Sequence, residues 1–231
     1  MNNAAPPLLE AQHITRRLPE GVTLVADASV KVERGEFIAI TGPSGSGKSS
    51  LLYLLGLLDR PTEGRVLLEG LDTASLSAAE LANLRLARLG FVFQFHFLLP
   101  EFSTLDNVLI PIRRLGRLQD AAARAQAMKL LEALGMADAA AKLPEQLSGG
   151  MRQRAAIARA LANDPAIILA DEPTGNLDTR NAAAVFDIFQ RLAAEEGRAI
   201  LVVTHDAELA KRANRRIHLV DGRIVSDTRV G

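Results

Sequence analysis

Eight consecutive residues, 42–49, combine glycines, hydroxyl groups and one lysine in an order that can hold phosphate. They read Gly42, Pro43, Ser44, Gly45, Ser46, Gly47, Lys48 and Ser49. This order fits the G-x-x-x-x-G-K-[ST] pattern of loops whose backbone N–H groups surround nucleotide phosphates. In such a loop the lysine ammonium reaches the β- and γ-phosphates, and the hydroxyl group after it lies on Mg²⁺. We therefore predict a nucleotide site here, with Ser49 as a metal ligand.

The segments on either side of this loop must position it. Residues 37–41 are a short apolar run of strand-forming residues, and residues 50–55 are apolar on nearly all sides, as in a buried helix. A strand, a glycine loop and a helix in this order direct the helix N-terminus at one anion. We therefore add Ser50 to the expected phosphate-binding residues. A glycine-rich turn that ends in Lys-Ser by coincidence is the alternative, and it would not need these flanks.

Two adjacent carboxylates, Asp171 and Glu172, follow the apolar run 166–170. Nucleotide hydrolases with such a loop hold Mg²⁺ through an acid beyond the carboxyl end of a neighbouring parallel strand, and Asp171 has that place. Glu172, one residue further on, could polarise the water that attacks the γ-phosphate. Alone, the pair could be solvated surface. Together with the phosphate loop it indicates nucleotide hydrolysis.

A third candidate segment, Ser148, Gly149 and Gly150, opens a predicted helix. Ser148 is a suitable N-cap, and two glycines let backbone N–H groups approach an anion closely. By itself the segment is better explained as a flexible helix start, because Ser-Gly-Gly is common in loops.

The rest of the chain alternates predicted strands and helices, which is typical of an α/β protein. Residues 8–14 and 22–32 predict an antiparallel hairpin, and residues 95–163 are rich in Ala, Leu and Arg, which favours helix. We therefore predict a P-loop NTPase core with a mixed sheet, helices on both faces and an N-terminal antiparallel β element. An α-helical subdomain is inserted into it. The whole chain, 1–231, is one domain, with its core at about 8–94 and 164–226 and the helical subdomain at about 95–163.

Three local patterns predict smaller features. Ser77 and Glu80 have the Ser-x-x-Glu spacing of a capping box at a helix start. Asp221 and Gly222 lie between two apolar runs and predict a hairpin with a type I′ turn. Tyr53, the one tyrosine, lies in the apolar helix after the phosphate loop, and we expect it to pack in the core.

Composition excludes several classes of protein. Lys plus Arg and Asp plus Glu both number 27, so the net charge is zero, which argues against a nucleic-acid partner. The absence of cysteine excludes disulfides and thiolate metal sites. Residues 1–7 lack the regions of a signal peptide, and no stretch reaches the roughly eighteen apolar residues of a membrane span. We expect any membrane role to come through a partner.

Six motifs follow one another in a set order. They are the phosphate loop, Gln94 at a strand end, Leu147-Ser148-Gly149-Gly150, the run 167–172, Gly175-Asn176-Leu177-Asp178 and Thr204-His205-Asp206. In order and spacing, over about residues 8–226, the chain resembles the ATPases of ATP-binding-cassette transporters. The resemblance implies a head-to-tail homodimer in which two ATP molecules lie between the phosphate loop of one copy and Ser148–Gly150 of the other.

The resemblance also implies roles for single residues. Gln94 would ligate Mg²⁺ and couple to integral membrane permease subunits, although alone it could be a polar strand end. Glu172 would be the general base and His205, otherwise an ordinary loop histidine, would contact the γ-phosphate. Asp178 would lie in the loop that joins the two sites.

Within that family, residues 93–100 and 104–108 resemble the group that serves lipoprotein release and MacB-type export, and residues 175–181 and 202–212 are most similar to the ATPase of the lipoprotein-releasing complex. This implies permease partners of the LolC/LolE kind and a place on the cytoplasmic side of the inner membrane. A MacB-like exporter of drugs or peptides and an FtsE-like regulator of cell division are the alternatives.

Two positions depart from the family pattern. Residues 14–18 have no aromatic side chain where one usually stacks on adenine, so Leu18 or an arginine plane would have to cover the base. Met151 stands where glutamine or glutamate usually follows the two glycines, so one polar contact across the dimer is lost.

Overall fold

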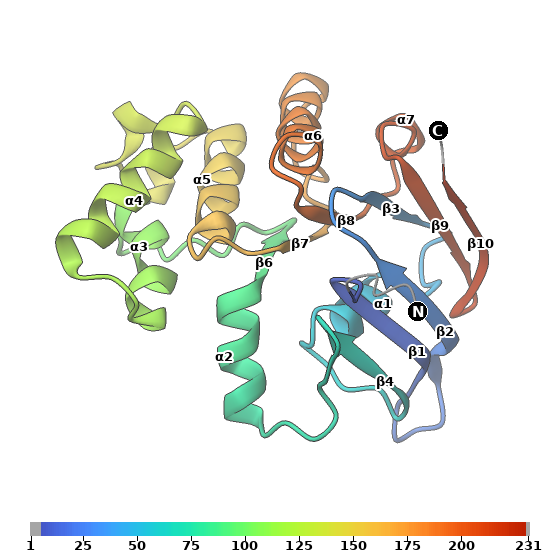
Figure 1. Cartoon of the computed structure of the whole chain (residues 1–231). Helices are drawn as coiled ribbons and strands as arrows, with labels where there is room; N and C mark the ends of the chain where they lie inside the picture. Colours follow the sequence, from blue (N-terminus) through green and yellow to red (C-terminus); the bar gives the residue numbers. More distant parts are fainter. Residues whose placement is uncertain (1–5, 230–231) are drawn as a thin grey trace.

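The computed structural model describes residues 6–229, which form two β-sheets with helices packed around them (Figure 1). Residues 1–5, part of the segment assessed above for a signal peptide, lie outside this range. None of the helices in the described range is both long and apolar enough to cross a bilayer.

The smaller sheet is antiparallel and has the strand order β2-β1-β4-β5. Strands β1 (Leu9–Arg17) and β2 (Thr23–Val32) pair as the predicted hairpin. Strand β4 (Glu63–Leu68) pairs with β1 on the other side, and the short β5 (Leu71–Asp72) completes the edge. This sheet is the N-terminal antiparallel element that the sequence predicts.

The larger sheet has six strands in the order β10-β9-β3-β8-β7-β6. Strands β3 (Phe37–Thr41), β8 (Ala199–Val203), β7 (Ile167–Asp171) and β6 (Leu89–Phe93) are parallel and almost fully buried. Their continuous apolar sequences are typical of strands covered on both faces. Strand β9 (Arg215–Val220) is parallel to β3, and β10 (Arg223–Arg229) returns antiparallel at the edge.

Helices cover both faces of this sheet. Helix α1 (Lys48–Leu55) lies between the sheets, in contact with β7 and β8 on one side and with β1 and β2 on the other. On the opposite face α6 (Thr179–Ala194) packs on β3 and β8, with the short α7 (Ala207–Ala210) beside it. The strand that precedes the phosphate loop therefore lies at the centre of the sheet, and the helix that follows it is held from both sides.

The helical insertion consists of α3 (Thr104–Leu115), α4 (Asp120–Ala133) and α5 (Gly149–Leu161), with two 3-10 turns at Ala137–Ala139 and Pro144–Gln146. It connects edge strand β6 to β7, and Figure 1 shows it to one side of the sheets, at the left. The predicted fold class, an α/β core with an inserted helical subdomain, is confirmed. The boundaries 95–163 stay a prediction.

Both predicted local features are present. Helix α2 (Ala78–Arg88) begins with a capping box, in which Ser77 Oγ accepts from the N–H of Glu80 at 3.3 Å and Glu80 Oε2 accepts from the N–H of Ser77 at 2.8 Å. The turn between β9 and β10 has positive φ at Asp221 (47°) and Gly222 (75°), as a type I′ turn requires.

Candidate functional site

The phosphate loop leaves the end of β3 and enters α1 at Lys48, with Gly47 as the N-cap. Two of its glycines leave no room for a side chain. A Cβ on Gly42 (φ 146°) would lie 2.1 Å from the Leu219 carbonyl oxygen, and one on Gly47 (φ 92°) would lie 2.2 Å from that of Leu24. The loop is thus pressed between backbone of β9 and backbone of β2.

A turn remote in sequence also supports the loop. The N–H of Gly222, in the β9–β10 turn, donates to the Ser46 carbonyl at 3.0 Å, and the Gly222 carbonyl accepts from the N–H of Ala26 in β2 at 2.8 Å. The C-terminal hairpin therefore links the phosphate loop to the smaller sheet. The hydrogen bond from Gly222 to Ser46 therefore helps to hold the backbone of the phosphate loop in its conformation.

The donors that the loop offers suit a polyphosphate. The Lys48 side chain is buried, and its Nζ donates to the carbonyls of Gly42 at 3.0 Å and Pro43 at 2.8 Å, so the ammonium lies within the loop. The first N–H groups of a helix have no intrahelical acceptor, and here they belong to Lys48 and the serines after it. Within the described residues, the buried Ser46 Oγ also has no hydrogen-bond partner.

A cavity of about 320 Å³ opens beside the start of α1. Asp171, the last residue of β7, meets two hydroxyl groups there: Ser49 Oγ donates to its Oδ1 at 2.9 Å, and the Tyr53 hydroxyl donates to its Oδ2 at 2.8 Å. The residues that line it come from α1, the end of β6 and the end of β7, and are Ser49, Tyr53, Phe93, Gln94, Phe95, Phe97, Asp171 and Glu172.

The residues of this cavity fit Mg²⁺ that is shared with a nucleotide. Hydroxyl, carboxylate and amide oxygens are the hard donors that Mg²⁺ prefers, and the ion usually completes its shell with water and phosphate oxygens. Within residues 6–229 no group of three or more His, Cys, Asp or Glu side chains could hold a metal by itself. We propose that Ser49, Asp171 and Gln94 hold the ion together with phosphate oxygens.

Glu172 has an unusual backbone conformation, with φ at 46°. A non-glycine residue in this region costs about 1–3 kcal/mol, so the surroundings must hold it. Its N–H donates to the Val203 carbonyl at the end of β8 (3.0 Å), and its Oε2 lies 3.1 Å from Nδ1 of His205. The turn brings the predicted base and the predicted γ-phosphate contact together beside the cavity.

Gln94 contacts the segment 175–178. Its Nε2 donates to Asn176 Oδ1 at 3.3 Å, and a Cβ on Gly175 would lie 2.7 Å from the same nitrogen. Asp178 is the N-cap of α6 and accepts from the N–H of Asn181 at 2.8 Å, and this hydrogen bond is the main cause that lowers the pKa of Asp178. The side chain of Asp178 is therefore ionised at neutral pH.

Ser148, Gly149 and Gly150 lie elsewhere. Ser148 is the N-cap of α5, and its Oγ accepts from the N–H of Met151 at 3.3 Å. Gly150 packs on Asn181, where a Cβ would come within 2.3 Å of the amide oxygen. None of the three lines the cavity beside α1. The structure thus brings Ser49, Gln94, Asp171 and Glu172 together around the cavity beside α1, with His205 in contact with Glu172. It leaves the segment Ser148–Gly150 apart.

Sequence reasoning missed one residue of this site. Tyr53 does not only pack in the core: its hydroxyl contacts Asp171. Burial, followed by the hydrogen bond to Asp171, raises the pKa of Tyr53 to about 12. The spacing of the residues could have indicated this role, because Tyr53 follows Ser49 by four residues and so lies on the same face of the helix.

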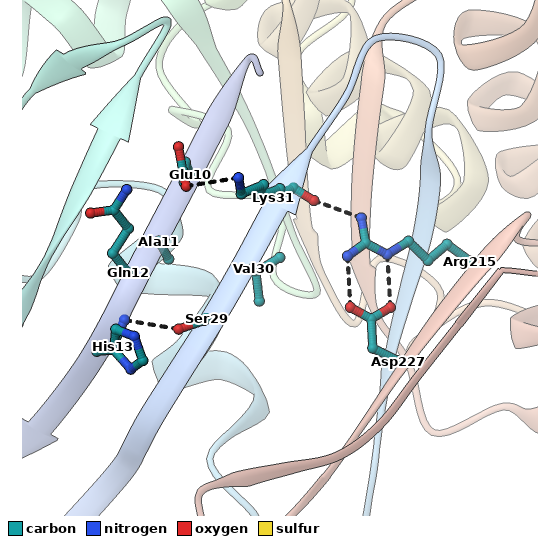
Figure 2. Close-up of a pocket in the computed structure, with 9 residues that line it drawn as sticks. All are labelled: Glu10, Ala11, Gln12, His13, Ser29, Val30, Lys31, Arg215 and Asp227. Carbon is teal, nitrogen blue, oxygen red and sulfur yellow. Dashed lines mark hydrogen bonds and ion pairs between the residues drawn. The ribbon is translucent and has the colours of Figure 1, made fainter. Parts of the chain in front are cut away.

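A second depression, of about 560 Å³, lies on the outer face of β1 and β2 (Figure 2) and shares no lining residue with the cavity beside α1. Its charged groups are paired with one another. Arg215 binds Asp227 through two hydrogen bonds of 2.8 and 2.6 Å and donates to the Lys31 carbonyl at 2.6 Å, while the Lys31 ammonium lies 3.2 Å from Glu10. Arg215, on β9, joins β10 of the larger sheet to β2 of the smaller sheet, which is a structural role.

A mostly parallel sheet with this loop, and with a carboxylate at the end of a nearby parallel strand, defines a P-loop nucleotide hydrolase. A family model described as "ABC transporter" matches residues 25–175. The chain is 50% identical over 230 residues to "Lipoprotein-releasing system ATP-binding protein LolD" of Bordetella pertussis (97% of this chain, 98% of that protein). It is 51% identical to "Lipoprotein-releasing system ATP-binding protein LolD 1" of Chlorobium chlorochromatii over 89% of this chain and 83% of that protein.

Two solved structures of the ATP-binding cassette MJ0796 are similar throughout. One is described as a dimeric post-hydrolysis state bound to ADP and Pi (TM-score 0.88) and the other as dimeric (TM-score 0.89). Each is 37% identical and covers 96% of this chain and 99% of the other. The chain belongs to the ABC transporter family and is one of its ATP-hydrolysing cassettes.

Proposed function

We propose that this chain is the ATPase subunit of a transporter that releases lipoproteins from the inner membrane. The observation that carries the proposal is the likeness to proteins named for lipoprotein release, at 50% identity over 97% of the chain. The resemblance of residues 175–181 and 202–212 to the ATPase of the lipoprotein-releasing complex supports it. Residues 93–100 and 104–108 resemble the wider group that serves lipoprotein release and MacB-type export.

In this proposal the phosphate loop and Lys48 bind the triphosphate, and Glu172 accepts a proton from the attacking water. Mg²⁺, held by Ser49, Gln94 and Asp171, would supply positive charge to the phosphate oxygens. His205 would orient Glu172 and contact the γ-phosphate, which the 3.1 Å separation of the two side chains favours. Hydrolysis then depends on a fixed base and fixed donors rather than on covalent chemistry.

The active form would be a homodimer. Ser148–Gly150 do not line the cavity of their own chain, so an anion in that cavity would meet this helix start only from a second copy. A helix N-terminus supplied in this way adds partial positive charge to the polyphosphate when the dimer closes. The dimers described for the cassette at 37% identity support this arrangement.

The membrane partner would bind next to Gln94. Phe95 and Phe97 expose 66% and 64% of their surface, and Phe102 and Leu99 expose 44% and 43%. Three of the eight phenylalanines of the chain are therefore exposed on this one loop. An apolar groove of about 390 Å³ between α2, β6 and α3 adjoins it. Aromatic side chains on an exposed patch are typical of a protein interface. Permease subunits of the LolC/LolE kind would hold the chain at the cytoplasmic face of the inner membrane.

The proposal is tested by purifying the chain from its native membrane in detergent, identifying its partners, and depleting it. We expect two permease subunits and lipoproteins retained in the inner membrane after depletion. Filaments with septation defects would instead indicate a division regulator, and co-purification with an exporter of drugs or peptides would indicate a MacB-like role. Either result would overturn the proposal while leaving the ATPase assignment in place.

A further inference from the structure

Tyr53 occupies a position that the ATPase reaction does not explain. It lies on α1 one turn after Ser49, and the two hydroxyl groups bind the two oxygens of one carboxylate, that of Asp171. Ser49 takes Oδ1 and Tyr53 takes Oδ2. All three side chains line the cavity in which we place the metal ion.

We propose that Tyr53 is a positioning residue for the metal site. Its hydroxyl holds Oδ2 of Asp171, so that Oδ1 faces the ion. The proposal rests on the proposed nucleotide site. An aspartate carboxylate turns easily about its terminal torsion, because that torsion has no sharp minima. A hydrogen bond to one oxygen removes this freedom, and it leaves the other oxygen next to Ser49, the second protein ligand.

The hydroxyl of Tyr53 suits this role because it is a hydrogen-bond donor that carries no charge. A neutral donor also holds the carboxylate without competing with the ion for it, as a lysine ammonium would. Hydrogen bonds to a ligating carboxylate typically raise metal affinity by about 10–100-fold.

The direct test measures metal affinity, not turnover. Mn²⁺ is titrated by electron paramagnetic resonance into the full-length protein with a non-hydrolysable ATP analogue, for the wild type and for Tyr53→Phe, which keeps the ring and loses the hydroxyl. We expect Mn²⁺ to bind about 10-fold more weakly to the variant. The affinity of the variant for the same nucleotide in excess chelator should equal that of the wild type. This measurement is the control, since a structural defect in α1 would lower the metal-free nucleotide affinity as well.

Equal Mn²⁺ affinity in the two proteins would overturn the role of Tyr53 and leave the proposed function standing. A wild type that binds no Mn²⁺ with nucleotide would overturn the proposed function itself. A variant that loses metal-free nucleotide binding to the same extent as Mn²⁺ binding would assign Tyr53 to packing and overturn the positioning role.

Discussion

Glu172 combines a strained backbone with a histidine partner at the end of a neighbouring strand. Strain of this kind persists where surrounding contacts hold a side chain in one direction. At this position the held direction is toward His205 and the cavity that Asp171 lines. We therefore expect Glu172 to act as the general base.

Glu172→Gln should therefore slow ATP hydrolysis by about 10²–10⁴-fold, the usual contribution of a general base. Nucleotide affinity should stay within about threefold, because the amide keeps the shape of the side chain and no phosphate contact is assigned to it. Phosphate release and nucleotide titration measure the two effects. Glu132→Gln, on an exposed position of α4, is the control. Hydrolysis near the wild-type rate would contradict the assignment of Glu172 as the base.

Lys48→Ala should act on binding instead. The ammonium is buried within the loop, where charge-assisted hydrogen bonds contribute about 1.5–3 kcal/mol each, so we expect nucleotide affinity to fall by about 10–100-fold. Equilibrium titration with a fluorescent ATP analogue measures the change, with the exposed Lys129→Ala as control. Unchanged affinity would show that the loop binds phosphate through its N–H groups alone.

The residues of this site could be predicted from sequence when each belonged to a short local pattern. The phosphate loop and the Asp171–Glu172 pair were predicted because strand, turn and acid follow one another along the chain. Tyr53 was assigned to packing because an apolar helix suggests core, and its partner lies 118 residues away in sequence. The roles of all these site residues stay predictions, and so do those of Gln94, His205 and Asp178.

At the scale of elements, local signals predicted local structure. The N-terminal hairpin, the capping box of α2 and the type I′ turn were all predicted from their own residues. The sequence did not indicate that β3 lies between β8 and β9, or that the β9–β10 turn supports the phosphate loop. Both depend on pairing between segments more than 150 residues apart, which no local propensity encodes.

Gly222→Ala tests whether the β9–β10 turn supports the phosphate loop. A Cβ there would lie 2.9 Å from the Leu24 carbonyl oxygen, next to the hydrogen bond from the Gly222 N–H to Ser46. We expect nucleotide affinity to fall several-fold. Gly197→Ala is a matched control, because Gly197 also has positive φ (65°) but no atom within 4 Å of the new Cβ. Equal losses in the two variants would mean that backbone strain alone, and not the contact with the loop, causes the effect.

Ser77→Ala tests the start of α2. Loss of an N-cap serine should lower the free energy of unfolding by about 1 kcal/mol, measured by urea denaturation. Ser226→Ala, on the exposed edge strand, is the control. A Ser77→Ala protein as stable as the wild type would show that the capping box does not contribute in solution.

The difference in stability between the wild type and Ser77→Ala should depend on pH. The hydrogen bonds from Ser77 lower the pKa of Glu80 below its ordinary 4.5. Their contribution to the free energy of unfolding is therefore present above pH 4.5 and is lost as the pH falls through the lowered pKa of Glu80. The stability difference between the wild type and Ser77→Ala should therefore shrink in acid. A difference that stays constant down to the acid transition would exclude a part for the ionised Glu80.

At the scale of the whole molecule, each proposed site needs a second copy of the chain. The Glu172→Gln protein should form a dimer on addition of ATP, because slow hydrolysis leaves the nucleotide between the copies. Adding Ser148→Arg should prevent this dimer, since the bulky side chain would fill the helix start that we propose faces the other copy. Size-exclusion chromatography with light scattering measures both. Ser77→Ala in the same background also removes an N-cap and should leave the dimer intact.

The support of the phosphate loop by the last hairpin also has a consequence for synthesis of the protein. A ribosome makes β3 and the loop early, but the strands on either side of β3, β8 and β9, begin only at Ala199 and Arg215. An incomplete nascent chain therefore carries the nucleotide motif without the backbone that shapes it. We therefore expect ATP to assist folding, and a membrane subunit to meet a functional cassette, only after β8, β9 and the β9–β10 turn have been made.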